Sequence, residues 1–263
     1  MERKSPCQCE VIYRRTLAPG VFEFFLDAPE IAGAAVPGQF VHILLPGRQL
    51  RRPISVCDAD AETGVLRIVF EVRGGGTELL SQTPRGARLD LLGPLGRGFE
   101  LPAGGGDPVL LVGGGIGVPP LLYLARQLGD GAVAALGFRS REAALLERDF
   151  ARVCRSTHVA TEDGSAGYHG YVTDCARALS FRAVCACGPA PMLRAAEKLA
   201  QQRGVPCQLS LERRMACGVG ACLGCAVRLR DADGHEGYGR VCKDGPVFRA
   251  EEIVWEEEAE RPG

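Results

Sequence analysis

Four cysteines near the carboxyl end of the sequence carry the clearest chemical signal. Cys217, Cys222 and Cys225 are spaced as C-x4-C-x2-C, and Cys242 follows after sixteen intervening residues. This spacing is close to that of the thiolate ligands of a plant-type [2Fe–2S] cluster. Glycines between the first three cysteines let the backbone curl around inorganic sulfur, because glycine reaches backbone angles that other residues avoid. The pattern predicts that these four thiolates bind a [2Fe–2S] cluster.

Two alternative structures also use four cysteines. A structural zinc site usually has two C-x2-C pairs, whereas the first spacing here is four and the last cysteine stands alone. A disulfide framework is typical of small secreted chains, but this chain has 263 residues and no apolar segment behind its charged N-terminus to form a signal peptide. A zinc-stabilised or redox-sensing binding module without turnover is the alternative of another class, and iron content and colour distinguish it.

The chain from Glu10 to about Pro102 consists of short β-type runs separated by Gly or Pro. The runs are CEVIYRRT, VFEFFLDA, GQFVHILLP, RPISVCDA, GVLRIVFEV and ARLDLLGPLG. Short runs with turn residues between them are typical of a small antiparallel barrel or sandwich. We therefore expect an N-terminal antiparallel β-barrel.

An R-P-x-S element opens the fourth run and indicates a dinucleotide site. The element is formed by Arg52, Pro53, Ile54 and Ser55. The Arg52 guanidinium group can hold a phosphate through two hydrogen bonds, and the Ser55 hydroxyl can bond a flavin or ribitol group. Gly76 and Thr77 lie where a glycine-rich turn enters a helix, and N–H groups at such a start favour an anion. A plain hairpin turn with an exposed arginine is the alternative.

A glycine-rich patch at residues 104–107 marks a change in the pattern of apolar residues along the chain. Beyond it, apolar strands alternate with amphipathic helices, beginning with the strand DPVLLV and the helix that follows. This alternation is the signature of a doubly wound parallel sheet. The sequence thus predicts a barrel domain at 1–103, an α/β domain at 104–208 and a cluster-binding segment at 209–263.

The first strand of the α/β part ends in a glycine turn that resembles a nucleotide loop. Its glycines are Gly113, Gly114, Gly115 and Gly117. They do not form a clean G-x-G-x-x-G. Where a Rossmann fingerprint has an acidic residue about twenty positions on, this chain has Arg139 and Arg141. Two arginines there can hold a 2′-phosphate, so both NADH and NADPH stay open.

Cys187, Gly188 and Pro189 follow another expected strand, at the strand end where open α/β sheets bind ligands. A thiol there could lie against a nicotinamide ring and a flavin edge, which makes Cys187 the candidate catalytic residue. A buried strand-end cysteine is the alternative interpretation. His158 and His169 have no carboxylate or serine partner at a suggestive spacing, so no hydrolytic triad is expected.

The composition limits the partners. Hydrophobic residues make up 46% of the sequence and charged residues 24%, as in ordinary globular proteins. The net charge of −1 gives no electrostatic reason to expect nucleic acid or an anionic membrane surface. No apolar run approaches the roughly 20 residues of a spanning helix, so we expect no membrane association and infer a reducing cytoplasm. The other cysteines are expected to be small buried apolar residues, namely Cys7, Cys9, Cys57, Cys154, Cys175, Cys185 and Cys207.

The chain as a whole resembles the electron-transfer subunits of the NAD-dependent dihydroorotate dehydrogenases, within the ferredoxin–NADP reductase-like superfamily. The resemblance runs from about Cys9 to Val254 and rests on the order of RRPIS, GGGT, GGGIGVPPL, TEDGS, CGPAPML, SLERRMACGVGACLGC and YGRVCKDGPVF. A flavin barrel first, a nicotinamide domain second and a cluster segment last distinguish this group from reductases with a ferredoxin domain at the front.

The resemblance implies that the cofactors are FAD, a [2Fe–2S] cluster and NAD(H). It places FAD contacts at Arg52, Pro53, Ile54, Ser55, Val69, Phe70, Glu71, Gly76 and Thr77, and cluster ligation at the four cysteines of the C-x4-C-x2-C pattern. Relatives often carry a basic residue where this chain has Glu71, so that contact is expected through the backbone only. Arg139 and Arg141 depart from the family's preference for NADH.

The resemblance also implies a function in pyrimidine (UMP) synthesis. The chain would pass electrons between NAD, FAD, the cluster and a separate FMN-containing catalytic subunit that oxidises dihydroorotate, in a heterotetramer of two of each subunit. Alone it should reduce artificial acceptors with NADH and show no dihydroorotate activity. The same architecture serves glutamate-synthase-like and hydrogenase-like complexes, and the partner that co-purifies distinguishes these alternatives.

Overall fold

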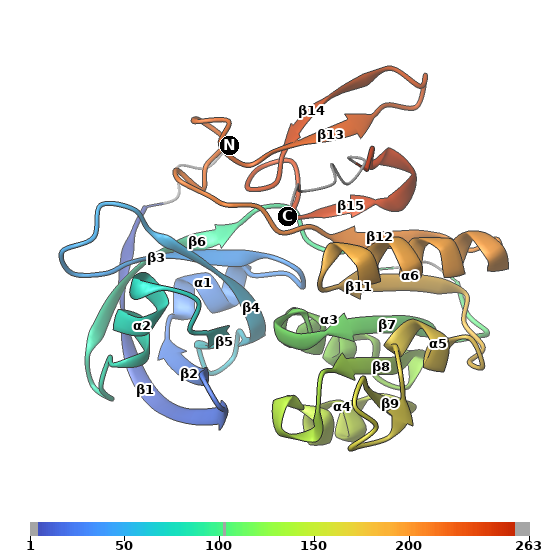
Figure 1. Cartoon of the computed structure of the whole chain (residues 1–263). Helices are drawn as coiled ribbons and strands as arrows, with labels where there is room; N and C mark the ends of the chain where they lie inside the picture. Colours follow the sequence, from blue (N-terminus) through green and yellow to red (C-terminus); the bar gives the residue numbers. More distant parts are fainter. Residues whose placement is uncertain (1–4, 102–103, 256–263) are drawn as a thin grey trace, which may run out of the picture.

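The N-terminal part of the chain is a closed barrel of six antiparallel strands (Figure 1). The computed structural model describes residues 5–101 and 104–255. The barrel strands are β1 (Cys7–Ala18), β2 (Val21–Asp27), β3 (Phe40–Leu44), β4 (Arg52–Asp60), β5 (Val65–Glu71) and β6 (Arg88–Leu95). Their spatial order is β1-β2-β5-β4-β3-β6. Each expected β-type run forms one of these strands, so the predicted barrel is confirmed.

Large apolar side chains fill the barrel. Phe24, Leu66 and Ile68 belong to its core and are fully buried. Burying a side chain of this size contributes about 1.5–3 kcal/mol, which makes the barrel a stable platform for the loops it carries. Two short helices lie in the connections, α1 (Pro29–Ala34) after β2 and α2 (Gly75–Ser81) after β5.

A seven-stranded sheet in the order β10-β9-β8-β7-β11-β12-β15 forms the second part, and only β15 runs antiparallel to its neighbour. Its strands are β7 (Val109–Gly114), β8 (Ala132–Phe138), β9 (Ser156–Thr161), β10 (Tyr168–His169), β11 (Ala183–Cys187), β12 (Cys207–Ser210) and β15 (Val247–Arg249). Its helices are α3 (Pro119–Leu128), α4 (Glu147–Val153), α5 (Val172–Ala176) and α6 (Ala190–Arg203).

Helices cover both faces of this sheet. Along β7, Leu110 and Val112 pack in the apolar cluster that includes α5 and α6, whereas Val109 and Leu111 pack in the cluster that includes α3 and α4. Alternate residues of a strand point to opposite faces, so a strand covered on both sides is apolar throughout. The predicted doubly wound sheet is confirmed.

The segment between β8 and β9 is not one continuous helix. A 3-10 turn occupies Arg141–Ala143, and α4 begins only at Glu147. Between them Leu146 adopts a left-handed conformation with φ of 58°, which an α-helix cannot contain. Among the helices of the described residues, none is long and apolar enough to cross a bilayer.

The cluster segment leaves the sheet after β12 and returns to it at β15. It carries a two-stranded hairpin of β13 (Ala226–Arg230) and β14 (Glu236–Arg240), which stands apart from the sheet in Figure 1. Hydrogen bonds hold both ends of the segment between β12 and β15. The N–H of Leu211 donates to the carbonyl of Pro246 at 2.9 Å, and β15 pairs with β12. The predicted boundary between 208 and 209 falls within β12, and the three-part division stays a prediction.

Candidate functional site

The four cysteines of the C-x4-C-x2-C pattern and Cys242 lie in two pairs. The side chains of Cys217 and Cys222 interact in the outer part of the loop, and those of Cys225 and Cys242, each 2% exposed, interact in its buried part. Within residues 5–101 and 104–255, no three of these sulfurs lie within 4.8 Å of one another. One tetrahedral zinc ion with bonds of about 2.3 Å would need all four sulfurs about 3.8 Å apart. Two separate pairs fit two iron atoms instead.

Backbone N–H groups point at these sulfurs. Gly220 N donates to Cys242 Sγ at 3.1 Å, and Ala221 N donates to Cys217 Sγ at 3.3 Å. The N–H of Cys242 donates to Cys225 Sγ at 3.5 Å. Hydrogen bonds to sulfur stabilise thiolates in iron–sulfur sites and tune their reduction potential. The donor set therefore fits a [2Fe–2S] cluster held by the four predicted ligands.

Neighbouring backbone N–H groups also make Cys217 acidic. Burial opposes its ionisation, but the backbone N–H groups of Val219, Cys222 and Ala221, with the side chain of Cys222, lower the pKa of Cys217 to about 6. In the chain stripped of metal, we expect iodoacetamide to alkylate Cys217 readily at pH 7, with a rate that rises through pH 6, because the thiolate is the nucleophile. Peptide mass spectrometry follows the reaction. The control is Cys175, whose pKa is raised by burial, and equal rates at pH 7 would contradict the prediction.

One side chain of the barrel reaches the cluster loop. His42 of β3 is fully buried, and a Cβ atom added to Gly218 would lie 2.3 Å from its Nδ1. Burial first, and then the positive charge of Arg51, lower the pKa of His42 to about 4, so the imidazole is uncharged at neutral pH. Nothing in the sequence indicates this contact, because His42 is one polar residue within the apolar run GQFVHILLP.

Arg52 and Gly76, expected to share a flavin site, are in contact. A Cβ atom added to Gly76 would lie 2.0 Å from Nε of Arg52, so the guanidinium group occupies the space that a side chain at 76 would fill. Thr77 Oγ1 accepts the N–H of Arg73 at 2.9 Å and shapes the turn before α2. Ser55 is half-buried on the strand that begins with Arg52. A guanidinium fork beside glycine backbone fits the pyrophosphate of FAD.

The other expected flavin contacts belong to the barrel wall. Ile54, Val69 and Phe70 are buried, with exposed fractions of 8%, 3% and 2%. Their side chains support the strands, so any contact with FAD from these positions is expected through the backbone. Pro53 is half-buried and lies opposite His42 in the pairing of β3 with β4.

Replacing Gly76 by alanine is expected to weaken FAD binding about tenfold while the chain still folds. The new methyl group collides with the flexible Arg52 side chain, which can swing away, so the loss falls on the pyrophosphate contact. Tenfold is about 1.4 kcal/mol, close to the value of one hydrogen bond to a charged group. Fluorescence titration of the flavin-free chain measures it. Gly74→Ala is the matched control, because a Cβ atom there meets nothing within 4 Å, and equal affinities in both variants would contradict the prediction.

A cleft of about 1110 Å³ lies between the barrel and the α/β sheet. The barrel contributes Val21, Glu71 and Arg73, and the sheet contributes Gly114, Gly115, Gly117, Gly188 and Pro189. The glycines follow β7 and β11 at the carboxyl ends of the strands, where open α/β sheets bind nucleotides. Gly113 lies deeper, since a Cβ atom there would meet Val118 at 2.8 Å. The cleft fits a nicotinamide dinucleotide placed against bare backbone.

An ion pair at the cleft edge neutralises Glu71. Arg73 Nε lies 2.7 Å from Glu71 Oε2, and Arg73 Nη1 lies 3.7 Å from Glu212 Oε2. Glu71 was expected to differ from relatives with a basic residue there, whereas Arg73 was not expected at this site. The Arg73 guanidinium group thus lies between the carboxylates of Glu71 and Glu212.

The two arginines expected to bind a 2′-phosphate lie in different surroundings. Arg139 lines the cleft together with Glu142 and Glu162. Arg141 instead donates through Nε to the carbonyl of Ser165 at 3.2 Å. A carboxylate in such a position can accept hydrogen bonds from ribose hydroxyls. Of the two arginines expected there, only Arg139 lines the cleft, and two carboxylates lie in the same part of its lining.

Cys187 lies behind the cleft wall that Gly188 and Pro189 form. It is 3% exposed, and burial raises its pKa to about 12, so the thiol stays protonated. A Cβ atom at Gly117 would lie 2.4 Å from the Cys187 carbonyl oxygen, so the two loops of the cleft touch here. The catalytic role of Cys187 stays a prediction.

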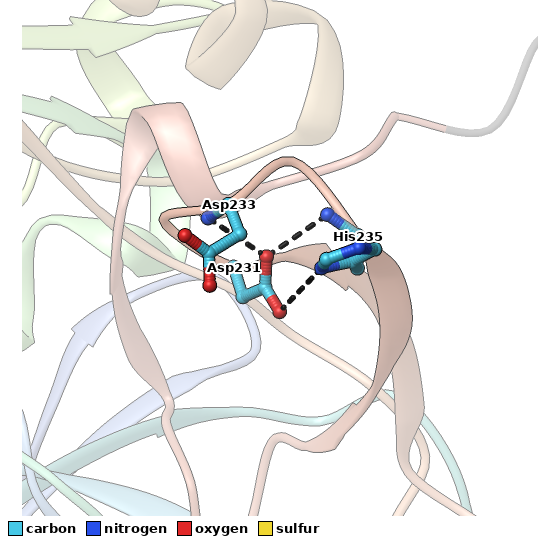
Figure 2. A group of neighbouring side chains, drawn as sticks. All are labelled: Asp231, Asp233 and His235. Carbon is cyan, nitrogen blue, oxygen red and sulfur yellow. Dashed lines mark hydrogen bonds and ion pairs between the residues drawn. The ribbon is translucent and has the colours of Figure 1, made fainter.

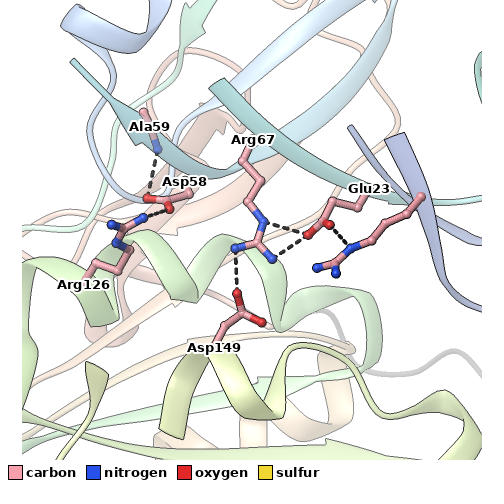
Figure 3. A network of polar contacts seen from close by, with 7 residues as sticks. Glu23, Asp58, Ala59, Arg67, Arg126 and Asp149 are labelled. Carbon is pink, nitrogen blue, oxygen red and sulfur yellow. Dashed lines mark hydrogen bonds and ion pairs between the residues drawn. The ribbon is translucent and has the colours of Figure 1, made fainter. Parts of the chain in front are cut away.

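Two ion pairs cross from the barrel to the helices of the α/β part (Figure 3). Arg67 of β5 donates to Asp149 of α4 at 2.9 Å, and Arg126 of α3 pairs with Asp58 of β4. Arg67 Nε also donates to Glu23 Oε1 at 2.7 Å, and Glu23 is fully buried. Each pair joins the barrel to the α/β part, next to apolar side chains of both parts that pack in one cluster.

A second group of possible metal ligands lies at the turn of the β13–β14 hairpin (Figure 2). Asp231, Asp233 and His235 are all exposed. Oδ1 of Asp231 accepts the N–H groups of Asp233 at 3.0 Å and His235 at 2.9 Å. The Asp231 carboxylate therefore builds its own turn, as aspartate commonly does, and the group is separate from the cluster loop.

The cysteines outside the site are mostly buried, as expected. Cys9, Cys57, Cys154, Cys185 and Cys207 are buried, whereas Cys7 and Cys175 are half-buried. The sulfurs of Cys7 and Cys9 lie 3.4 Å apart on β1. These thiols fill the interior as small apolar groups.

Named proteins match this chain in sequence over nearly its whole length. Residues 212–254 match the family described as "Iron-sulfur cluster binding domain of dihydroorotate dehydrogenase B". The chain is 46% identical over 255 residues to the protein named dihydroorotate dehydrogenase B (NAD(+)), electron transfer subunit, of Geobacillus thermodenitrificans, with 93% of this chain and 96% of that protein covered. The protein of the same name from Bacillus caldolyticus is 46% identical over 253 residues, with 93% and 96% covered.

A solved structure is similar over the same extent. It is described as giving "Insights into flavin-based electron bifurcation via the NADH-dependent reduced ferredoxin-NADP oxidoreductase structure". It aligns with a TM-score of 0.82 and 34% identity, covering 95% of this chain and 91% of that chain. The similarity extends over the barrel, the sheet and the cluster segment together.

Proposed function

Since the chain belongs to the electron transfer subunits of dihydroorotate dehydrogenase B (NAD(+)), we propose that it passes electrons between NAD(H) and a separate catalytic subunit that oxidises dihydroorotate. It is an oxidoreductase subunit with FAD, a [2Fe–2S] cluster and NAD(H) as cofactors. The observation that carries the proposal is the double pair of cysteines, held by backbone N–H groups on a loop that rests on the flavin barrel.

The residues of the chain bind and orient these groups. Arg52, with the bare backbone at Gly76, would hold the pyrophosphate of FAD, and Ser55 and Thr77 would offer hydroxyl groups to the cofactor. The glycine turns around Gly115 and Gly188 let the nicotinamide nucleotide approach the backbone. When bound, NAD(H) exchanges a hydride, the flavin exchanges one or two electrons, and the cluster exchanges one. The chain supplies their spacing and excludes water from the interior.

The partner we propose is an FMN-containing catalytic subunit, in a heterotetramer of two of each subunit in the cytoplasm. The loop that carries Cys222 offers the surface for it. Leu223 is 64% exposed and Val219 is 47% exposed, so apolar side chains surround the outer pair of cysteines. Exposed apolar side chains grouped around a redox site are typical of a protein contact.

The first test uses the chain alone, purified and loaded with FAD and cluster without oxygen. It is expected to reduce ferricyanide with NADH and to show no dihydroorotate oxidation. Affinity purification of the tagged chain from its own cells then identifies the partner by mass spectrometry. An FMN-containing partner that restores dihydroorotate-dependent NAD reduction supports the proposal.

Two outcomes would contradict it. A fully loaded chain that fails to oxidise NADH has no role as a reductase. A partner of the glutamate-synthase or hydrogenase type would leave the cofactor chemistry intact and move the chain to another complex.

A further inference from the structure

His42 is a buried polar side chain to which the proposed function assigns no role. Val41 and Ile43 belong to the barrel core, so by the alternation of a strand Phe40 and His42 lie on the outer face of β3. The cluster segment covers that face, because Phe40 packs in the same apolar cluster as Cys225. The imidazole is therefore enclosed between the barrel wall and the cluster segment, with no exposed surface.

The backbone of Cys217 and that of Arg51 interact with the imidazole of His42, but neither ring nitrogen makes a hydrogen bond of full geometry among the described residues. The neighbouring cation is engaged elsewhere: Arg51 donates to the backbone carbonyl of His42 at 3.1 Å and forms an ion pair with Asp90 at 2.6 Å. Across the strands the neighbours are Pro53 on β4 and Leu92 on β6. A buried polar group without a partner is costly, and folded proteins seldom keep one.

The ring faces the loop that carries the cluster ligands. Nδ1 is the atom nearest to the position of a Cβ at Gly218, at 2.3 Å, and Gly218 directly follows Cys217. Gly218 has a φ of +70°, a left-handed conformation that glycine tolerates. The imidazole thus takes the space that any side chain at 218 would need, and it does so beside the first ligand of the cluster.

We propose that His42 is a positioning residue that donates its ring N–H to sulfur at the Cys217 side of the cluster. The proposal rests on the proposed function, since it requires the cluster. A neutral imidazole carries one N–H donor, and hydrogen bonds to an anionic acceptor are stronger than neutral ones. Such a bond stabilises the more negative, reduced state of the cluster and raises its reduction potential. It also ties the cluster loop to β3, which pairs with the strand that begins with Arg52.

The test is electron paramagnetic resonance of the reduced, loaded chain prepared with ¹⁵N-histidine. The chain contains four histidines, so the labelled positions are few. We expect electron spin-echo modulation from one ¹⁵N nucleus near the cluster, which His42→Leu removes. The same variant should shift the midpoint potential of the cluster to a more negative value, whereas flavin reduction by NADH keeps its rate.

Two further variants keep the outcome decisive. His42→Gln retains an N–H donor of similar reach, so the midpoint potential of the cluster should lie closer to the wild-type value than in His42→Leu. If the leucine variant does not fold, the glutamine variant is measured in its place. His158→Gln, on β9 of the sheet, is the matched control and should change neither signal. A normal cluster with no ¹⁵N modulation, or a potential unchanged in both His42 variants, overturns the proposal. A wild-type chain without any [2Fe–2S] signal would instead overturn the proposed function.

Discussion

Replacing Cys222 by serine is expected to abolish the [2Fe–2S] absorption and its paramagnetic signal while the yellow flavin stays bound. Dihydroorotate-dependent NAD reduction by the complex should fall by at least about 100-fold, since losing a ligand costs no less than losing an outer-shell partner. Cys222 is exposed, so the substitution removes a ligand without opening a cavity in the core. Absorption and paramagnetic resonance spectra, with flavin content by acid release, measure the result.

The control is Cys175→Ser, a half-buried cysteine on α5 outside the cluster loop. It should keep both chromophores and nearly full activity. Retention of a normal cluster in Cys222→Ser would mean that a residue other than Cys222 completes the set of four ligands. Loss of both cofactors would mean that the cluster loop stabilises the barrel more than the contacts indicate.

Replacing Arg67 by leucine should have the largest effect on stability. The substitution leaves the buried Glu23 with one partner and breaks the bridge to Asp149, and removing one partner from a buried ion pair costs about 3–5 kcal/mol. Because the bridge joins the barrel to the α/β part, which together line the cleft, hydride transfer from NADH should slow as well, by tenfold or more, as misplacement of reacting groups does. Urea unfolding of the flavin-loaded chain and stopped-flow flavin reduction measure the two effects.

Arg15→Leu is the matched control, because Arg15 is the other partner of Glu23 and its side chain is 46% exposed. A pair with a solvent-exposed member contributes about 0–1 kcal/mol, so this variant should lose little stability and no rate. If the two variants unfold at the same urea concentration, the bridge to Asp149 contributes nothing and the cleft is held by apolar packing alone.

The parts of the fold that depend on short stretches of sequence were predictable. The six barrel strands appear as separate β-type runs, and β7 with α3 appears as an apolar strand, a glycine turn and an amphipathic helix. The cluster ligands were predictable for the same reason, since Cys217, Cys222 and Cys225 lie within nine residues of one another. The distant Cys242 could be added only because the whole pattern matches a known spacing.

The parts that join distant segments were not predictable. Arg67 and Asp149 are 82 residues apart, and Arg126 and Asp58 are 68 apart, so nothing local connects them. The contact of His42 with Gly218 depends on how the cluster segment folds back over β3. The ion pair of Arg73 was not predictable either, although its partner is close in the sequence. Its pairing with Glu71 two residues away depends on the side chains meeting at the cleft edge.

The fastening of residues 211–246 at both ends has a kinetic consequence. β15 pairs with β12, the N–H of Leu211 bonds the Pro246 carbonyl, and the N–H of Arg97 on the barrel side bonds the Gly245 carbonyl. A segment held at both ends in this way does not move as a mobile arm. The redox centre that it carries therefore keeps its distance from its electron donor. Electron tunnelling across one constant gap is then the route, and glycerol or sucrose that thickens the solvent should leave the internal transfer rate unchanged.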